Sequence, residues 1–156
     1  MREKVSETLV LLTAKTKLDR DRGYRQLNDL IVTLNADEIV QLETYLLDFI
    51  GAVDESASIN GVEAGAAPNE VKDWERLLGL ASGAGLLNLS GQGEEEFAEK
   101  MIEPSMTALT HAEVRVREKV GWLLGTIAAR WGFYERVAVM QLRWEGVKMC
   151  TDQSVI

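Results

Sequence analysis

Apolar residues recur at spacings of three and four along most of the chain, and this period constrains the fold more than any other feature. The first example is the series Val5, Leu9 and Leu12, which lies on one face of a helix over residues 3–15. The chain has no convincing run of alternating β-branched residues, the pattern typical of a half-buried strand. The sequence therefore predicts an all-α protein. The expected helices cover residues 3–15, 19–34, 37–50, 69–81, 94–110, 113–130 and 133–150, about seven in all.

Two stretches interrupt this period and are expected to be loops. Residues 54–69 contain glycine, proline, alanine and serine without a helical apolar pattern, which indicates an acidic surface loop. The glycines between positions 83 and 93 surround a short apolar patch and predict that the preceding helix ends near Ala81. With 156 residues, of which 46% are hydrophobic, the chain can bury one core, so we expect residues 1–156 to form a single domain.

Charge is distributed unevenly, with an acidic middle between two weakly basic ends. Residues 35–103 hold three Lys/Arg and fifteen Asp/Glu, whereas residues 1–34 and 104–156 each carry a net charge of +2. Such an acidic belt repels a phosphate backbone, so we expect no nucleic-acid partner. A charge run usually forms a solvated face, and the alternative here is a docking surface for a basic segment of another protein.

Residues 97–125 carry a proline inside the first expected helix and, after a short turn, a Val-Arg pair and a Leu-Gly pair in the second. The residues concerned are Pro104, Val116, Arg117, Val120, Leu124 and Gly125. This pattern resembles a HEAT repeat, a helix pair of the HEAT/Armadillo-like helical repeat family, although Thr110 and His111 stand where that family usually has an aspartate. Independently of the resemblance, Pro104 removes a backbone donor and bends its helix, and the apolar residues can bury against a neighbour.

The resemblance implies a short α-solenoid in which antiparallel helix pairs stack side by side. Three pairs are expected: the first helix with the second, the third with the fourth, and the pair over 94–130. The helix over 133–150 would open a fourth pair and is apolar around much of its circumference. We infer self-association through this C-terminal helix, a bound partner or a longer array, and the alternative is that the helix folds back as a cap.

Residues suited to metal or nucleophilic chemistry are few. His111 and Cys150 are the only histidine and cysteine, so a zinc site would need several carboxylates and a histidine-based triad would have to form around His111. The stretch 19–23 is similar to a calcium loop, but Leu30 stands where a bidentate glutamate is needed. We therefore expect no cofactor, no metal and no catalysis. A small helical enzyme remains a further hypothesis, which requires a pocket that gathers the aspartates of 19–23 or the glutamates 94–96 beside His111.

The expected cellular location follows mainly from the targeting and membrane-spanning segments that the sequence lacks. The first twelve residues lack the continuous apolar segment and cleavage site of a secretory signal. The longest apolar runs are far shorter than the roughly 20 residues that span a bilayer, so we expect no membrane partner. A lone cysteine suits a reducing compartment. We therefore expect a cytoplasmic protein, with the nucleus as the alternative.

These features favour a protein-interaction scaffold or adaptor, whose inner helices present a groove to a peptide or helix of another protein. The alternative function is a regulatory or assembly subunit of a larger enzyme complex. Arginine and tryptophan are enriched among binding hot spots. Arg117 has an alternative role, the internal packing contact that its repeat position usually provides. The expected partner contacts are Arg115, Arg117, Trp122, Arg130 and Trp144.

Overall fold

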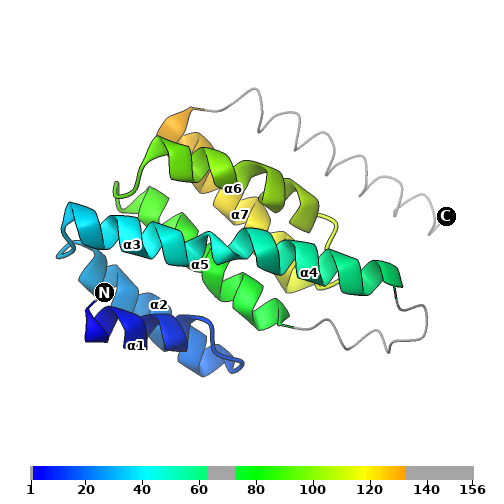
Figure 1. Cartoon of the computed structure of the whole chain (residues 1–156), viewed down its shortest axis with the longest axis horizontal. Coiled ribbons are helices and arrows are strands. Elements are labelled where there is room, and N and C mark those ends of the chain that lie inside the picture. Colours follow the sequence, from blue (N-terminus) through cyan, green and yellow to red (C-terminus); the bar gives the residue numbers. More distant parts are fainter. Residues whose placement is uncertain (1, 63–72, 133–156) are drawn as a thin grey trace.

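The structure, a computed structural model, describes residues 2–62 and 73–132, and every regular element in these ranges is a helix (Figure 1). The all-α prediction is therefore confirmed for the described residues. The expected helix over 133–150, which includes Trp144, lies outside them. None of the described helices combines the length and hydropathy that a bilayer crossing requires. The helices are α1 Glu3–Leu12, α2 Lys17–Ile31, α3 Ala36–Leu46, α4 Asp48–Val62, α5 Trp74–Leu89, α6 Glu95–Ala108 and α7 Val114–Trp131.

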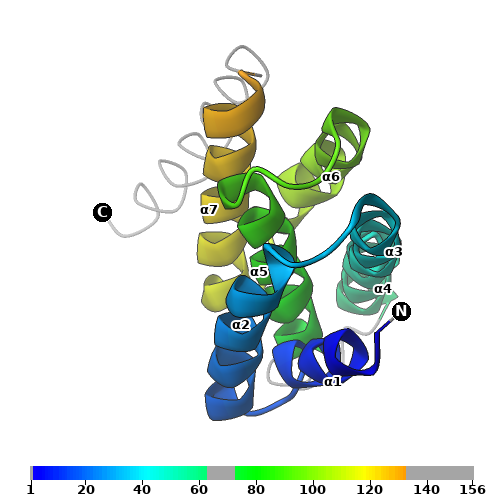
Figure 2. The same ribbon diagram turned by 90° about the vertical axis from the view of Figure 1, so that its left-hand side faces the viewer.

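The helices form packed pairs that are arranged in two rows (Figures 1 and 2). α1 packs against α2, α3 and α4 pack against α5, and α6 packs against α7. Figure 2 shows α2, α5 and α7 in one row, while α1, α3, α4 and α6 lie on the other side. α5 also contacts α2 and α7, and α4 contacts α6, so the middle pair joins the outer two. The three helix pairs expected from the sequence are therefore present.

α5 lies at the centre and is longer than the sequence predicted. The expected end near Ala81 is wrong, because the helix continues through Gly83 and Gly85. Glycine costs about 1 kcal/mol relative to alanine inside a helix. A β-carbon at Gly85 would overlap the Trp122 ring, so the missing side chain lets α7 approach closely. Nearly all residues from 77 to 88 are buried, and this burial offsets the low helix propensity.

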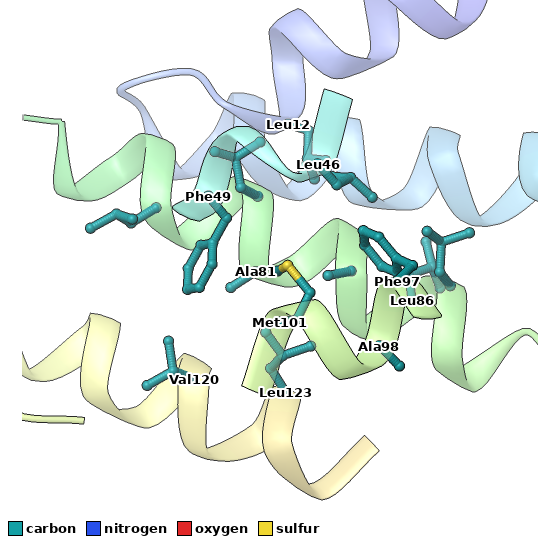
Figure 3. Close-up of a cluster of buried hydrophobic side chains, with 14 of the residues drawn as sticks. Leu12, Leu46, Phe49, Ala81, Leu86, Phe97, Ala98, Met101, Val120 and Leu123 are labelled. Atoms are coloured by element: carbon teal, nitrogen blue, oxygen red, sulfur yellow. The ribbon is translucent and has the colours of Figure 1, made fainter. Parts of the chain in front are cut away.

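The buried apolar side chains form one cluster around α5. Figure 3 shows how helices from both rows contribute to it. Four large side chains, from α3, α4, α6 and α7, are fully buried beside Ala81 of α5; they are Leu46, Phe49, Met101 and Leu123. α5 contacts α1, α2, α3, α4 and α7, so both rows of helices pack against it.

The stretch expected as an acidic loop over 54–69 is helical in its first part. Residues 54–62 belong to α4, so the loop prediction is wrong for them, and residues 63–69 lie outside the described residues. Phe49 and Val53, one turn apart in α4, are buried in the core. Once this turn is packed, each further residue adds a backbone hydrogen bond without a new nucleation cost. Small and polar residues can therefore continue a helix that they would not start.

Local caps account for two further differences in helix boundaries. The single helix expected over 37–50 is divided at Leu47, which caps the end of α3 immediately before α4 begins. α2 begins earlier than expected, because the Thr16 side chain accepts a hydrogen bond from the backbone N–H of Asp19 at 3.4 Å. Asp19 therefore lies in the first turn, where its negative charge complements the helix dipole.

Candidate binding groove

An open groove of about 600 Å³ crosses the row of α2, α5 and α7. α2 and α7 form its walls, because α5 lies between them (Figure 2). Leu78 and Ser82 of α5, together with Leu12 of α1, form its floor. The wall on α2 consists of Lys17, Arg20, Asp21 and Tyr24, and the wall on α7 consists of Arg115, Glu118, Lys119 and Trp122.

Trp74, the first residue of α5, joins the two walls at one end of the groove. The guanidinium carbon of Arg115 lies 4.0 Å from the centre of the Trp74 ring, and that of Arg20 lies 5.5 Å from it. Arg20 is buried and donates from Nη1 to the carbonyl oxygens of Ala14 and Lys15 at 3.0 and 2.7 Å. Cation–π attraction to a shared ring therefore links α2 and α7 at this end of the groove.

Lys119 and Trp122 occupy the α7 wall one turn further along. The Lys119 ammonium lies 4.8 Å from the centre of the Trp122 ring. Burial lowers the pKa of Lys119 below its ordinary value, and the carboxylate of Asp21 on the opposite wall partly offsets this shift. Burial also raises the pKa of Tyr24. Lys119, in the middle of the groove, is therefore partly shielded from water and faces the carboxylate of Asp21.

Two of the five expected partner contacts, Arg115 and Trp122, line this groove. Arg117 instead donates from Nη1 to the carbonyl oxygens of His111, at 2.7 Å, and Ala112, at 3.3 Å. This is the internal role that the sequence left open, since it fastens the turn between α6 and α7. Trp144 lies outside the described residues.

Arg130 also makes internal contacts. Its guanidinium donates to the carbonyl oxygens of Leu87 at 3.2 Å, Gly91 at 2.9 Å and Gly93 at 3.0 Å, and also to that of Gln92. These carbonyls belong to the end of α5 and the glycine turn after it. Arg130 thus satisfies acceptors that a helix end leaves without an intrahelical partner.

Sequence reasoning missed the other cationic and aromatic residues at or beside the groove: Lys17, Arg20, Tyr24, Trp74 and Lys119. On each wall the lining residues do recur at spacings of three and four, which places them on one helix face. That spacing could have grouped the residues of each wall separately. It does not reveal that the two faces oppose each other, because this depends on how α2 and α7 pack against α5.

Charge is segregated between the two rows of described helices. α2, α5 and α7 together contain nine Lys/Arg and five Asp/Glu. α1, α3, α4 and α6 contain two Lys/Arg and twelve Asp/Glu. The groove therefore lies on the positive side of a chain whose net charge is −8.

The arrangement needed for the enzyme hypothesis is not formed by the described residues. His111 is buried in the turn after α6, and its Nδ1 accepts a hydrogen bond from the backbone N–H of Glu113 at 3.0 Å. The glutamates 94–96 lie at the opposite end of α6, roughly 20 Å away for a helix of 14 residues. Asp21 lines the groove, but His111 does not.

Within the described ranges, no three His, Cys, Asp or Glu side chains are grouped so that they could hold a metal ion. The groove instead combines cationic, aromatic and apolar side chains on an open surface, a combination that suits binding of another molecule. No family model, curated protein or solved structure matches this chain.

Proposed function

We propose that this chain is a protein-interaction scaffold, a short HEAT-like α-solenoid that holds a segment of another protein in the groove between α2 and α7. Each helix pair in a solenoid packs mainly on its neighbours, and one row of helices provides an extended binding surface. The joining of the outer pairs through α4 and α5 supports this assignment. So does the position of the groove on the row of α2, α5 and α7.

The observation that carries the proposal is the composition of the groove walls. Trp122 and Tyr24 lie on opposite walls, and Arg20 and Arg115 belong to the same surface. Tryptophan, tyrosine and arginine are the residues most enriched among binding hot spots, since each provides a large contact area together with a polar group. The proposed role is binding without catalysis.

Site-specific photo-crosslinking tests this proposal. A photoreactive phenylalanine analogue replaces Ser82 on the groove floor, and the chain is irradiated in the cells that produce it. A matched chain carries the analogue at Thr44, which is exposed on α3 in the opposite row. Mass spectrometry identifies the adducts. We expect Ser82 to give a protein adduct that Thr44 does not give.

Two results would overturn the proposal: no protein adduct from Ser82, or identical adducts from both positions. An adduct of two copies of this chain would replace it with self-association. A subunit of an enzyme complex, recovered in fixed stoichiometry from both Ser82 and Thr44, would favour the assembly-subunit function instead, because the partner would then cover both rows.

A further inference from the structure

The groove has the opposite charge to most of the molecule. Its walls present four cationic side chains, Lys17, Arg20, Arg115 and Lys119, against two carboxylates. The chain as a whole has a net charge of −8. A local positive surface with apolar walls concentrates the field and attracts an anionic group.

Part of this positive charge is balanced inside the protein, because the Arg115 Nε pairs with the Glu113 carboxylate at 2.8 Å. Arg20 and Lys119 form no ion pair among the described residues. Arg20 donates to two backbone carbonyl oxygens, which fix its position but leave its charge in place. The ion pair of Lys17 with Asp21 is 3.6 Å long and joins two exposed side chains, so it contributes little. Lys119 lies over the Trp122 ring and is partly desolvated, so a bound carboxylate would stabilise its charged form.

The length of the walls limits what fits between them. The lining residues cover positions 17–24 of α2 and 115–122 of α7, so each wall is roughly 10 Å long at 1.5 Å per residue. An extended polypeptide spans that distance with about three residues. Tyr24, Trp122 and Leu78 line the same space and provide an apolar surface. A short segment with charged residues beside an apolar residue matches these dimensions.

We infer that the occupant of the groove is a short acidic segment of a partner protein, in which Asp or Glu residues stand beside one aromatic or aliphatic side chain. The apolar side chain packs between Tyr24 and Trp122, and the carboxylates face Lys119 and Arg115, which follow one another towards the Trp74 end of the groove. This inference rests on the proposed function and adds the chemical class of the partner.

A single-stranded nucleic acid is the other anionic polymer that could stack on tryptophan. Two observations favour the peptide. Asp21 and Glu118 stand among the cations on the walls, which leaves room for isolated carboxylates but repels a continuous row of phosphates. The opposite row of helices carries twelve acidic side chains, so a long polyanion would meet a repulsive field beyond the groove.

Fluorescence polarisation with the full chain tests the inference. One labelled peptide of about eight residues has Asp and Glu on both sides of a central Phe-Leu pair. A second has Asn and Gln in place of every acid, and a labelled oligothymidine of similar length is the third probe. We expect the acidic peptide to bind at least tenfold more tightly than the other two. Its affinity should fall as the salt concentration rises from 0.1 M to 1 M, because the Debye length shortens from about 10 Å to about 3 Å.

Neutralised variants locate the binding. The double variant Arg115→Gln/Lys119→Gln should weaken binding of the acidic peptide at least fivefold. Lys17→Gln, at an exposed position, should weaken it about twofold. Lys100→Gln removes a cation from the exposed face of α6 and should leave binding unchanged. Circular dichroism confirms that each variant is folded, and Lys17→Gln remains informative if the double variant is not.

The outcomes separate the inference from the function on which it rests. If the amide peptide binds as tightly as the acidic one and Trp122→Ala weakens both, the groove binds peptides but the acidic preference is wrong. Tighter binding of the oligothymidine than of the acidic peptide would also overturn the inference. If no peptide binds and Ser82 gives no crosslinked protein, the proposed function itself is wrong.

Discussion

The contact between α1 and α5 depends on a glycine, Gly79. Its replacement by alanine leads to a prediction for the free energy of unfolding. Gly79 in α5 faces the C-terminal end of α1, and a β-carbon there would overlap the carbonyl oxygen of Leu12 and lie 2.8 Å from its carbonyl carbon. These are backbone atoms, which cannot rotate away as a side chain can. Gly79→Ala therefore requires a shift of α1 relative to α5.

Two effects of opposite sign decide the magnitude. Alanine improves the helix propensity of α5 by about 1 kcal/mol. Overpacking a close contact typically costs 1–3 kcal/mol. We expect a cost of about 3 kcal/mol or more here, because the atoms in the way belong to the backbone and cannot rotate aside. We expect Gly79→Ala to lower the free energy of unfolding by about 2 kcal/mol, which corresponds to a decrease in Tm of about 4–8 °C for a chain of this size.

Gly121→Ala provides the matched control. Gly121 is exposed in the middle of α7, and a β-carbon there would meet no atom within 4 Å. Only the propensity term acts, so this variant should raise the free energy of unfolding by about 0.5–1 kcal/mol. Urea unfolding followed by circular dichroism at 222 nm measures both. If the two alanines shift stability in the same direction, the close approach of α1 to α5 is not as described.

Three further predictions concern internal polar groups. Arg130→Met should lower the free energy of unfolding by about 2 kcal/mol, because the carbonyls at the end of α5 lose a charged donor. Arg25→Met, at an exposed position, is the control. Equal effects of the two variants in urea unfolding would contradict the role of Arg130. Burial lowers the pKa of His111 below its ordinary 6.5, so the unfolded chain binds the proton more readily and stability should fall as pH decreases through that value. Between pH 7.5 and 5.5, the Tm of His111→Gln should depend less on pH than the Tm of the wild type. An equal dependence would show that His111 does not cause the loss of stability. Burial raises the pKa of Glu43 above 4.5, so the folded chain favours its protonated form and the contribution of Glu43 decreases as pH rises above that value. The stability of the wild type relative to Glu43→Gln should therefore decrease between pH 4 and pH 7. A stability difference that stays constant over this range would contradict a raised pKa of Glu43.

The sequence predicts the helix pairs because amphipathic spacing is a local property. Val116, Val120 and Leu124 are all buried in α7, as their spacing indicates, and α6 contains Pro104 as expected. Residues 54–62 and the glycines of α5 could not be predicted in this way. Residues 54–62 have no apolar period. The glycines of α5 lie where a β-carbon would meet atoms of neighbouring helices, and this close fit depends on tertiary packing.

The candidate site was predictable only in part for a related reason. Arg115 and Trp122 could be selected because arginine and tryptophan are favoured in interfaces wherever they occur. Arg130 has the same residue type but a different role, since the carbonyls that it contacts lie about forty positions earlier in the sequence. Which arginine faces a groove and which fastens a turn follows from tertiary packing.

The shape of the groove depends on a second glycine, and here the obstacle is a side chain. A β-carbon at Gly85 would overlap the Trp122 ring, which is only partly buried and can rotate toward the groove. Gly85→Ala should therefore change Tm by less than about 2 °C, since the propensity gain offsets the cost of moving the ring. The displaced indole would fill the space between the walls, so the acidic peptide should bind at least fivefold more weakly. A loss of stability as large as that of Gly79→Ala, with peptide binding unchanged, would mean that Trp122 is locked in the core and does not control access to the groove.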